Sequence, residues 1–217
     1  MSPHPRAERS ALADLLSASG PDEPTLCEGW TTYDLAAHVV ARDRRPLSLP
    51  GLVLPALAGL TERSRRGVRR SHPYDELVSL VRAGAPVWSP VGLPGAAGAS
   101  GVIEFFVHHE DVRRTADGWT PRDLPGDLQE ALWRRLRGMA RLTLRRAPVG
   151  VVLRRPDGAE VAARDGDPRV VVSGPVGELV LWTTGRRGHA RVELDGAPDA
   201  VRRLRGSDSR RGPFTGP

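Results

Sequence analysis

The sequence predicts an α+β protein in which a helical N-terminal part is followed by a small α/β unit. Apolar residues recur at helical spacing up to about residue 146 and alternate as in a strand after Pro148. The chain has 217 residues, which is enough to bury a core, and its single cysteine excludes an internal disulfide. We therefore expect two domains, at residues 1–147 and 148–204. Residues 205–217 are rich in Gly, Ser, Arg and Pro, and we expect a disordered tail there.

Breaks that contain glycine or proline separate the helices expected in the N-terminal part. The first helix runs from about Ala7 to Ser19 and ends before Gly20. A second begins at Thr31, because Thr31 has the pattern of an N-cap and Asp34 follows three residues later. Further helices are expected over residues 49–69 with interruptions, 74–83, 100–117 and 125–146, with a loop over 86–99.

Short strands and helices alternate in the part that follows Pro148. Residues 149–155 and 159–163 have the pattern of a hairpin around Pro156-Asp157-Gly158. Further strands are expected over 169–173 and 190–194, and helices over 175–184 and 197–204.

The composition is that of a globular protein in water, with 39% hydrophobic and 27% charged residues. The longest apolar stretch, residues 47–60, is interrupted by prolines and glycines and falls short of the ~20 residues of a membrane-spanning helix. The first residues are polar where a secretory signal has an apolar segment. We therefore expect a cytoplasmic protein that does not enter the membrane.

The net charge of +6 rests on arginine alone, because all 32 basic residues are Arg. Such a bias is typical of GC-rich coding sequences and does not by itself indicate a nucleic-acid partner. One local cluster comprises Arg63, Arg65, Arg66, Arg69 and Arg70. Aromatic residues are not interleaved with it, so we interpret it as a solvated loop or helix end rather than a phosphate-binding patch.

Two histidines lie at helical spacing from carboxylates. Glu104 and His108 are four residues apart, which places them about 40° apart around a helix. Asp111 lies about 20° from Glu104 on the other side, whereas His109 points about 140° away. On the second expected helix, Asp34 and His38 repeat the spacing.

If these two helices are neighbours, His38 meets Glu104 and His108. Two imidazoles and one carboxylate leave a coordination position open for water or substrate, as in catalytic metal sites. In the alternative interpretation, His38 and His108 are ordinary buried histidines that hydrogen-bond to Asp34 and Glu104 one turn earlier. The spacing alone leaves both interpretations open.

Other catalytic patterns are absent from the sequence, which has no H-E-x-x-H, no G-x-S-x-G and no P-loop. Cys27 precedes the expected His38 helix. A nucleophilic role is open to it, but the sequence places no base nearby, which favours a partly buried structural thiol.

Two motifs carry a family resemblance. Trp30-Thr31-x-x-Asp34-Leu35-x-x-His38, followed by Glu104-x-x-x-His108-His109-x-Asp111, resembles the signature of the mycothiol-dependent maleylpyruvate isomerase and DinB-like metal-binding superfamily. The resemblance implies a four-helix bundle that holds zinc or another divalent ion through His38, Glu104 and His108. Asp34 and Asp111 would then orient the histidine ligands.

The second domain resembles the small, sterol-carrier-like α/β domain of the same superfamily. The resemblance rests on Val171-Val172-Ser173-Gly174-Pro175-x-x-Glu178-Leu179 and on Gly185-Arg186. It implies a substrate-binding arginine in this domain, for which Arg186 and Arg187 are the candidates.

The resemblance implies an enzyme in which the metal activates a low-molecular-weight thiol, mycothiol, for attack on an electrophile in a transfer or isomerisation. The expected partners are thus a small thiol and an electrophilic substrate, without nucleic acid or membrane, for a monomer or homodimer. The alternative is a non-catalytic metal-binding or regulatory module. A third class, a nucleic-acid binder, would depend on the arginines between Arg63 and Arg70.

Overall fold

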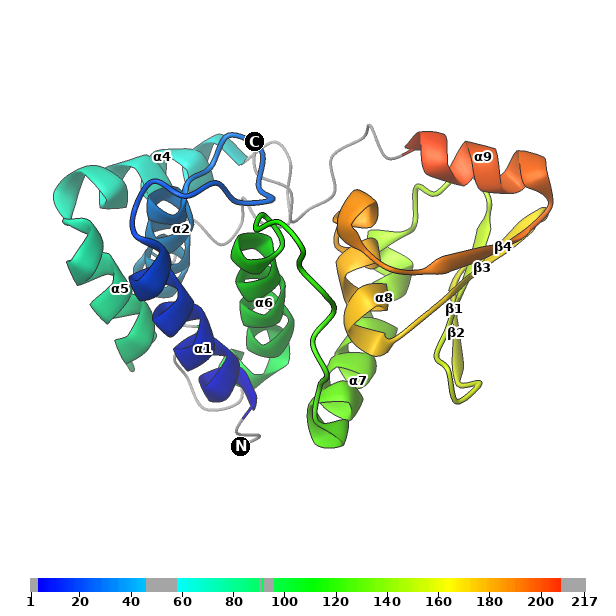
Figure 1. Cartoon of the computed structure of the whole chain (residues 1–217), viewed down its shortest axis with the longest axis horizontal. Coiled ribbons are helices and arrows are strands. Elements are labelled where there is room, and N and C mark those ends of the chain that lie inside the picture. Colours follow the sequence, from blue (N-terminus) through cyan, green and yellow to red (C-terminus); the bar gives the residue numbers. More distant parts are fainter. Residues whose placement is uncertain (1–3, 46–57, 90, 92–95, 208–217) are drawn as a thin grey trace. The chain divides into compact units, whose positions relative to one another are not determined.

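The computed structural model describes residues 4–45, 58–89, 91 and 96–207, and it divides into two units (Figure 1). Unit 1 extends to Trp119, and unit 2 begins at Thr120. No helix among the described residues is long and apolar enough to cross a lipid bilayer.

The regular elements of unit 1 are all helices in the part of the chain that the structure describes. Its α-helices are α1 (His4–Ser19), α2 (Thr32–Arg44), α4 (Ala58–Ser71), α5 (Tyr74–Ala83) and α6 (Ala96–Arg113). Helix α1 packs against α5 and α6, while α2 packs against α4 and α5. Apolar side chains from α1, α2, α4, α5 and α6 form one core, together with Cys27 and Trp30 from the loop before α2.

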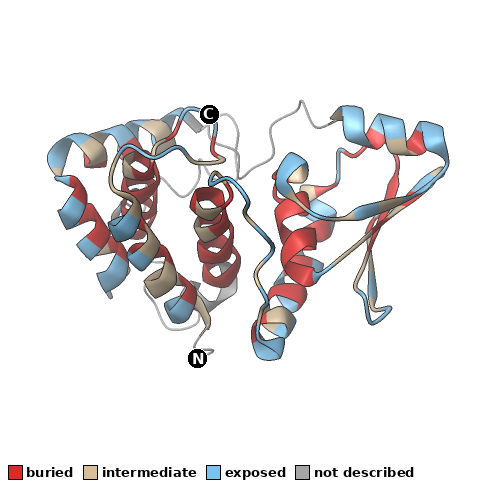
Figure 2. Ribbon diagram, in the orientation of Figure 1, coloured by how far each residue is buried: buried red, intermediate tan, exposed pale blue. Residues whose placement is uncertain are grey.

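Helix α2 begins where the sequence predicts it. The Thr31 backbone N–H donates to Asp34 Oδ2 at 3.2 Å, which completes a capping box. Nearly every residue from Thr32 to Asp43 is buried, so α2 lies inside the unit rather than on its surface (Figure 2). A helix buried on all sides presents its polar residues to neighbouring elements rather than to water.

Helix α6 is also buried on several sides, and it carries charged side chains into the interior. Glu104, His108, Glu110 and Asp111 are all buried. Burying a charge without a partner is costly, so each of these groups needs a counter-charge or a hydrogen bond. The contacts of Glu104, His108 and Asp111 define the candidate site.

Unit 2 combines helices with a four-stranded sheet of order β2-β1-β3-β4. Strand β1 pairs antiparallel with β2 and parallel with β3, and β3 pairs antiparallel with β4. Helix α7 packs against α8 and β2. The elements are α7 (Gly126–Thr143), β1 (Gly150–Arg154), β2 (Glu160–Arg164), β3 (Arg169–Ser173), α8 (Val176–Thr183), the 3-10 helix η4 (Arg187–His189), β4 (Glu193–Gly196) and α9 (Pro198–Gly206).

The mixture of helices and a small sheet confirms the α+β class, while several boundaries differ from expectation. The expected boundary near residue 147 lies instead after Trp119, because the buried face of α7 packs on α8 and β2. Helix α6 already begins at Ala96, inside the expected 86–99 loop. Strand β4 is displaced from the expected 190–194 to Glu193–Gly196.

Helix α9 extends to Gly206, so the first residues of the expected 205–217 tail are helical. Residues 208–217 of that tail lie outside the described residues, as does the part of the expected 49–69 helix that precedes residue 58.

Candidate metal centre

The loop before α2 is fixed against the C-terminal half of α6. Thr25 Oγ1 donates to the carbonyl oxygen of Trp30 at 3.0 Å and accepts from the Cys27 N–H at 3.2 Å. The Leu26 N–H donates to the Asp111 carbonyl at 2.9 Å. These bonds hold the Cys27 and Trp30 side chains beside the polar groups of α2 and α6.

His38 of α2 and Glu104 and His108 of α6 converge in this interior. His38 Nε2 lies 3.4 Å from Glu104 Oε1, and His108 Nε2 lies 3.4 Å from the same oxygen. The two imidazole rings are 5.2 Å apart between centroids and nearly perpendicular, at 75°. The structure thus brings together the three residues that the sequence singled out as metal ligands.

The spacing of these ligand atoms suits a tetrahedral divalent ion. Ligand atoms placed about 2.0–2.1 Å from zinc at tetrahedral angles are about 3.3–3.4 Å from one another. Both nitrogen-to-oxygen distances, 3.4 Å each, match this separation, and the ligand atoms of the three residues all lie within 4.8 Å of one another. The donor set therefore fits zinc.

Asp111 fixes the orientation of the His108 ring. His108 Nδ1 lies 3.0 Å from Asp111 Oδ2. An ionised carboxylate can only accept, so Nδ1 carries the proton and Nε2 is left toward Glu104. Asp111 thus contacts the ring that the sequence analysis expects it to orient.

Cys27 joins this arrangement from the other side. Its Sγ lies 3.4 Å from Asp111 Oδ2, and the thiol is buried. Cys27, His108 and Asp111 form a second group whose ligand atoms lie within 4.8 Å of one another. Because Asp111 already accepts hydrogen bonds from both neighbours, we interpret this group as support for the His108 ring.

Arg42 is the site residue that the sequence analysis missed. Its Nε lies 3.5 Å from Glu104 Oε1, and its side chain is buried. Arg42 follows His38 by one helical turn, so both residues face Glu104. The four-residue spacing between His38 and Arg42 is the sequence signal that could have indicated this contact, but an arginine near the end of a helix is more often a surface residue.

The surrounding groups shift the pKa values of the three candidate ligands in different directions. Burial opposes ionisation of Glu104, but Arg42 and the two histidines hold its pKa well below the ordinary value. Burial lowers the pKa of His38. For His108, burial is outweighed by hydrogen bonds with Asp111, Cys27 and Glu104, which raise its pKa well above the ordinary value.

Trp30 covers the outer side of His38. The two ring centroids are 5.1 Å apart, and the guanidinium carbon of Arg65 lies 4.8 Å from the Trp30 ring centroid. The tryptophan thus separates the imidazole from the arginines of α4 and limits its contact with water.

Asp34 contacts other residues than expected. Its carboxylate accepts from the Thr31 N–H, from Arg65, and from Arg69 Nη1 at 2.8 Å. Helix α4 packs along α2 and supplies both arginines, which attract a carboxylate more strongly than a neutral imidazole does. Asp34 therefore ties α2 to α4 instead of orienting His38.

His109 and the two candidate arginines of unit 2 contact other groups than the three candidate metal ligands. His109 Nδ1 lies 3.8 Å from Glu110 Oε1, and His109 is absent from both metal-competent groups of the described residues. Arg186 is buried and donates to the Thr184 carbonyl at 2.8 Å. The Arg187 guanidinium lies 4.3 Å from the Trp182 ring centroid.

Comparison with known proteins bears on the fold. No protein-family model and no curated protein sequence matches this chain. The crystal structure of the mycothiol-dependent maleylpyruvate isomerase is similar, with a TM-score of 0.56 and 20% identity over 88% of this chain and 90% of that one. A structure of a histidine-to-alanine mutant of that isomerase has a TM-score of 0.51, 21% identity and the same coverage. The chain therefore shares its fold with this isomerase.

Proposed function

We propose that this protein binds a divalent metal ion, zinc in preference to others, through His38, Glu104 and His108 and acts as a mycothiol-dependent transferase or isomerase. The observation that carries the proposal is the pair of 3.4 Å distances from one Glu104 oxygen to two histidine Nε2 atoms. On this proposal the helices of unit 1 correspond to a DinB-like four-helix bundle, and unit 2 corresponds to a sterol-carrier-like domain.

The chain's own groups have distinct parts in this function. His38 and His108 hold the ion through Nε2, and Asp111 keeps the His108 proton on Nδ1. Glu104 would supply one negative charge and, with the two imidazoles, would leave the ion room for an external ligand. The bound ion supplies Lewis acidity, which lowers the pKa of a coordinated thiol.

The charge balance of the site favours a thiolate over a neutral thiol. Glu104 offsets only one of the two charges of a divalent ion, and the buried Arg42 guanidinium adds a positive charge 3.5 Å from the same carboxylate. A site with excess positive charge stabilises an anion at its open position. Burial of the surrounding side chains strengthens this effect by excluding water.

Metal analysis and turnover test the proposal in sequence. We expect about one equivalent of zinc per chain, and we expect H38A, E104A and H108A to lose it. His189 is an exposed histidine of unit 2, so H189A is the matched control and should retain the metal. A purified protein that holds no metal and gains none on titration would overturn the site assignment.

Activity is then measured with mycothiol as the thiol. The readouts are isomerisation of maleylpyruvate and transfer of mycothiol to 1-chloro-2,4-dinitrobenzene. Metal-dependent turnover of either substrate supports the enzyme. A metal-loaded protein that turns over neither, and that shows no mycothiol-induced change in the absorption of a cobalt-substituted site, identifies the alternative, a non-catalytic metal-binding module.

A further inference from the structure

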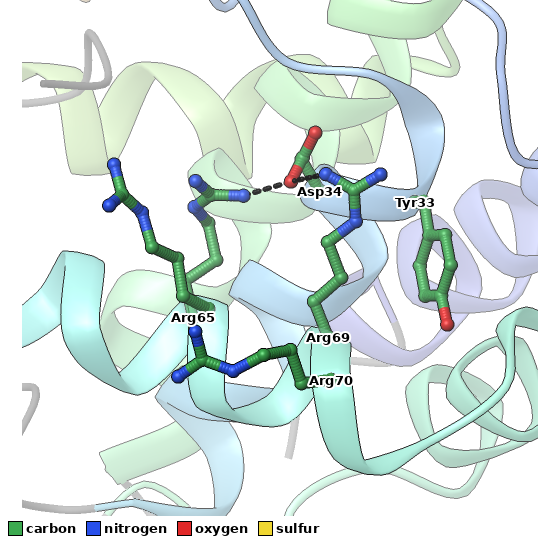
Figure 3. A pocket seen from close by; sticks show the side chains of 6 residues that line it. Tyr33, Asp34, Arg65, Arg69 and Arg70 are labelled. Carbon is green, nitrogen blue, oxygen red and sulfur yellow. Dashed lines mark hydrogen bonds and ion pairs between the residues drawn. The ribbon is translucent and has the colours of Figure 1, made fainter.

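A second candidate site lies in unit 1, where α4 passes along the N-terminal half of α2. An open hollow of about 390 Å³ is lined there by Tyr33, Asp34, Arg65, Arg66, Arg69 and Arg70 (Figure 3). These arginines belong to the cluster that the sequence analysis interpreted as a solvated loop or helix end. In the structure they lie on α4 and extend into its last turn, and four of them line a concave surface to which α2 contributes an aromatic residue.

The hollow carries more positive than negative charge. Among the described residues that line it, four carry guanidinium groups and only Asp34 carries a carboxylate. Glu62, one turn before Arg65 and Arg66, pairs with both of these arginines. Counting both carboxylates against the four arginines still leaves an excess of two positive charges.

Two of the guanidinium groups are held in place by the protein. Arg65 and Arg69 both donate to Asp34 Oδ1, as Figure 3 shows. The Arg69 guanidinium carbon also lies 4.9 Å from the ring centroid of Tyr33, whose hydroxyl donates to the His72 carbonyl at 2.6 Å. An arginine that is already ordered loses less conformational entropy when it binds a ligand.

The hollow also keeps donors for an external ligand. A guanidinium has five N–H donors, and Arg69 directs one nitrogen, Nη1, to Asp34. Arg70 is exposed and has no hydrogen-bond or ion-pair partner among the described residues, and Figure 3 shows that its side chain does not reach Asp34. Several N–H groups therefore face a small concave volume with one aromatic wall.

We propose that this hollow binds a small dianion that carries a phosphate group or two carboxylates. Guanidinium groups recognise both kinds of oxyanion through paired N–H donors, and a dianion matches the excess of two positive charges. None of the residues that line the hollow is a candidate metal ligand. The two sites are neighbours, because Asp34 lies one turn before His38 on α2 and the Arg65 guanidinium carbon lies 4.8 Å from the ring centroid of Trp30, which contacts His38. The proposal does not depend on metal binding.

Direct titration tests the site. Inorganic phosphate and succinate are titrated separately into the full-length protein at constant ionic strength, with chloride as the compensating salt, and binding is followed by NMR shifts of arginine Nε–H and α4 backbone amides. We expect saturable binding of at least one anion, with the shifts confined to α4 and the start of α2. Preference for phosphate or succinate identifies which oxyanion chemistry the site selects.

Variants distinguish anion binding in the hollow from attraction to the positive charge of the surface in general. R70Q removes an arginine that has no partner within the described part of the chain, and loss of its charge-assisted hydrogen bonds to the anion should weaken anion binding about five- to tenfold. R63Q removes an exposed arginine of the same helix that does not line the hollow, and it should change binding by less than about twofold. E104A should bind the anion as the parent protein does.

Three results would overturn the proposal. They are the absence of saturable binding by either anion at constant ionic strength, an equal loss of binding in R70Q and R63Q, and shifts spread over the whole basic surface. Tighter binding of a single-stranded oligonucleotide than of free phosphate at the same phosphate concentration would also overturn it, since that result indicates a nucleic-acid surface.

Discussion

His108 donates its Nδ1 proton to Asp111 Oδ2 at 3.0 Å while its Nε2 lies 3.4 Å from Glu104 Oε1. Both contacts lie within α6, at spacings of three and four residues. One helix therefore supplies a candidate ligand, the carboxylate beside it and the group that fixes its tautomer. Of the three candidate metal ligands, only His38 comes from another helix, α2.

The first prediction concerns that tautomer. D111N keeps an oxygen that can accept from Nδ1 but removes the negative charge, so His108 becomes a weaker ligand. We expect the affinity for zinc to fall about tenfold, which is the lower end of the usual effect of such partners. Competition with a chromophoric chelator measures the affinity. An unchanged affinity, with an unchanged circular dichroism spectrum, would show that the negative charge of Asp111 does not strengthen His108 as a ligand.

The second prediction is that metal binding releases a proton. The pKa of His108 is raised well above its ordinary value of 6.5, so the ring is protonated at neutral pH until a cation displaces the proton from Nε2. Zinc affinity should therefore rise as the pH increases toward the pKa of His108 and fall as the pH is lowered. Calorimetry in buffers of different ionisation enthalpy counts the protons. If none is released at pH 7, His108 is neutral before binding.

The third prediction is that one substitution, R42Q, raises zinc affinity but lowers turnover. Arg42 repels a divalent ion but stabilises an anionic ligand bound to it, because its Nε lies 3.5 Å from Glu104 Oε1. R42Q should therefore raise zinc affinity by roughly tenfold and raise the pKa of a bound thiol, which lowers turnover near neutral pH. The pH profile of turnover should shift upward. A loss of both zinc and activity would indicate a structural role alone.

The fourth prediction concerns acid stability. Burial opposes ionisation of Glu110, but the neighbouring His109 imidazole and hydrogen bonds from Arg113 and Arg114 lower its pKa to about 2. Because the folded-state pKa is depressed, this stabilisation is present above pH 4.5 and is lost as the pH falls toward 2. E110Q should lower the free energy of unfolding by about 3 kcal/mol at neutral pH.

Urea unfolding of the parent protein and E110Q at pH 7, 5 and 3 measures this difference. The gap between the two proteins should narrow below about pH 4.5. A gap of constant size across this range would show that the charge of Glu110 contributes nothing beyond its packing.

The candidate site was more predictable from the sequence than the contacts around it. Glu104 and His108 lie on one helical face whatever the fold, so their proximity follows from spacing. Asp34 has the same spacing from His38, yet it pairs with Arg65 and Arg69, because α4 brings two cations to it. Spacing within a helix cannot reveal which groups a neighbouring helix supplies.

The domain boundary illustrates the same limit. Leu132 and Leu136 recur at helical spacing within α7, and both are fully buried. Hydrophobic periodicity shows that a face is covered but not which elements cover it, and α7 packs on α8 and β2 of unit 2. The aromatic wall of the arginine hollow was missed for a related reason, since Tyr33 comes from α2.

The last prediction separates the protein's own thiol from an external one. Cys27 Sγ lies 3.4 Å from Asp111 Oδ2, and a serine at this position keeps a donor for that carboxylate. On the proposed function, C27S should therefore keep thiol-dependent turnover and zinc content within about twofold of the parent protein. C27A removes the donor, so it should weaken zinc binding, but by less than D111N does. Turnover with mycothiol and zinc content are measured on the same preparations, with E104A as the inactive reference. If C27S loses its activity while zinc is retained, the nucleophile is the Cys27 thiol, and the external thiol has a different role.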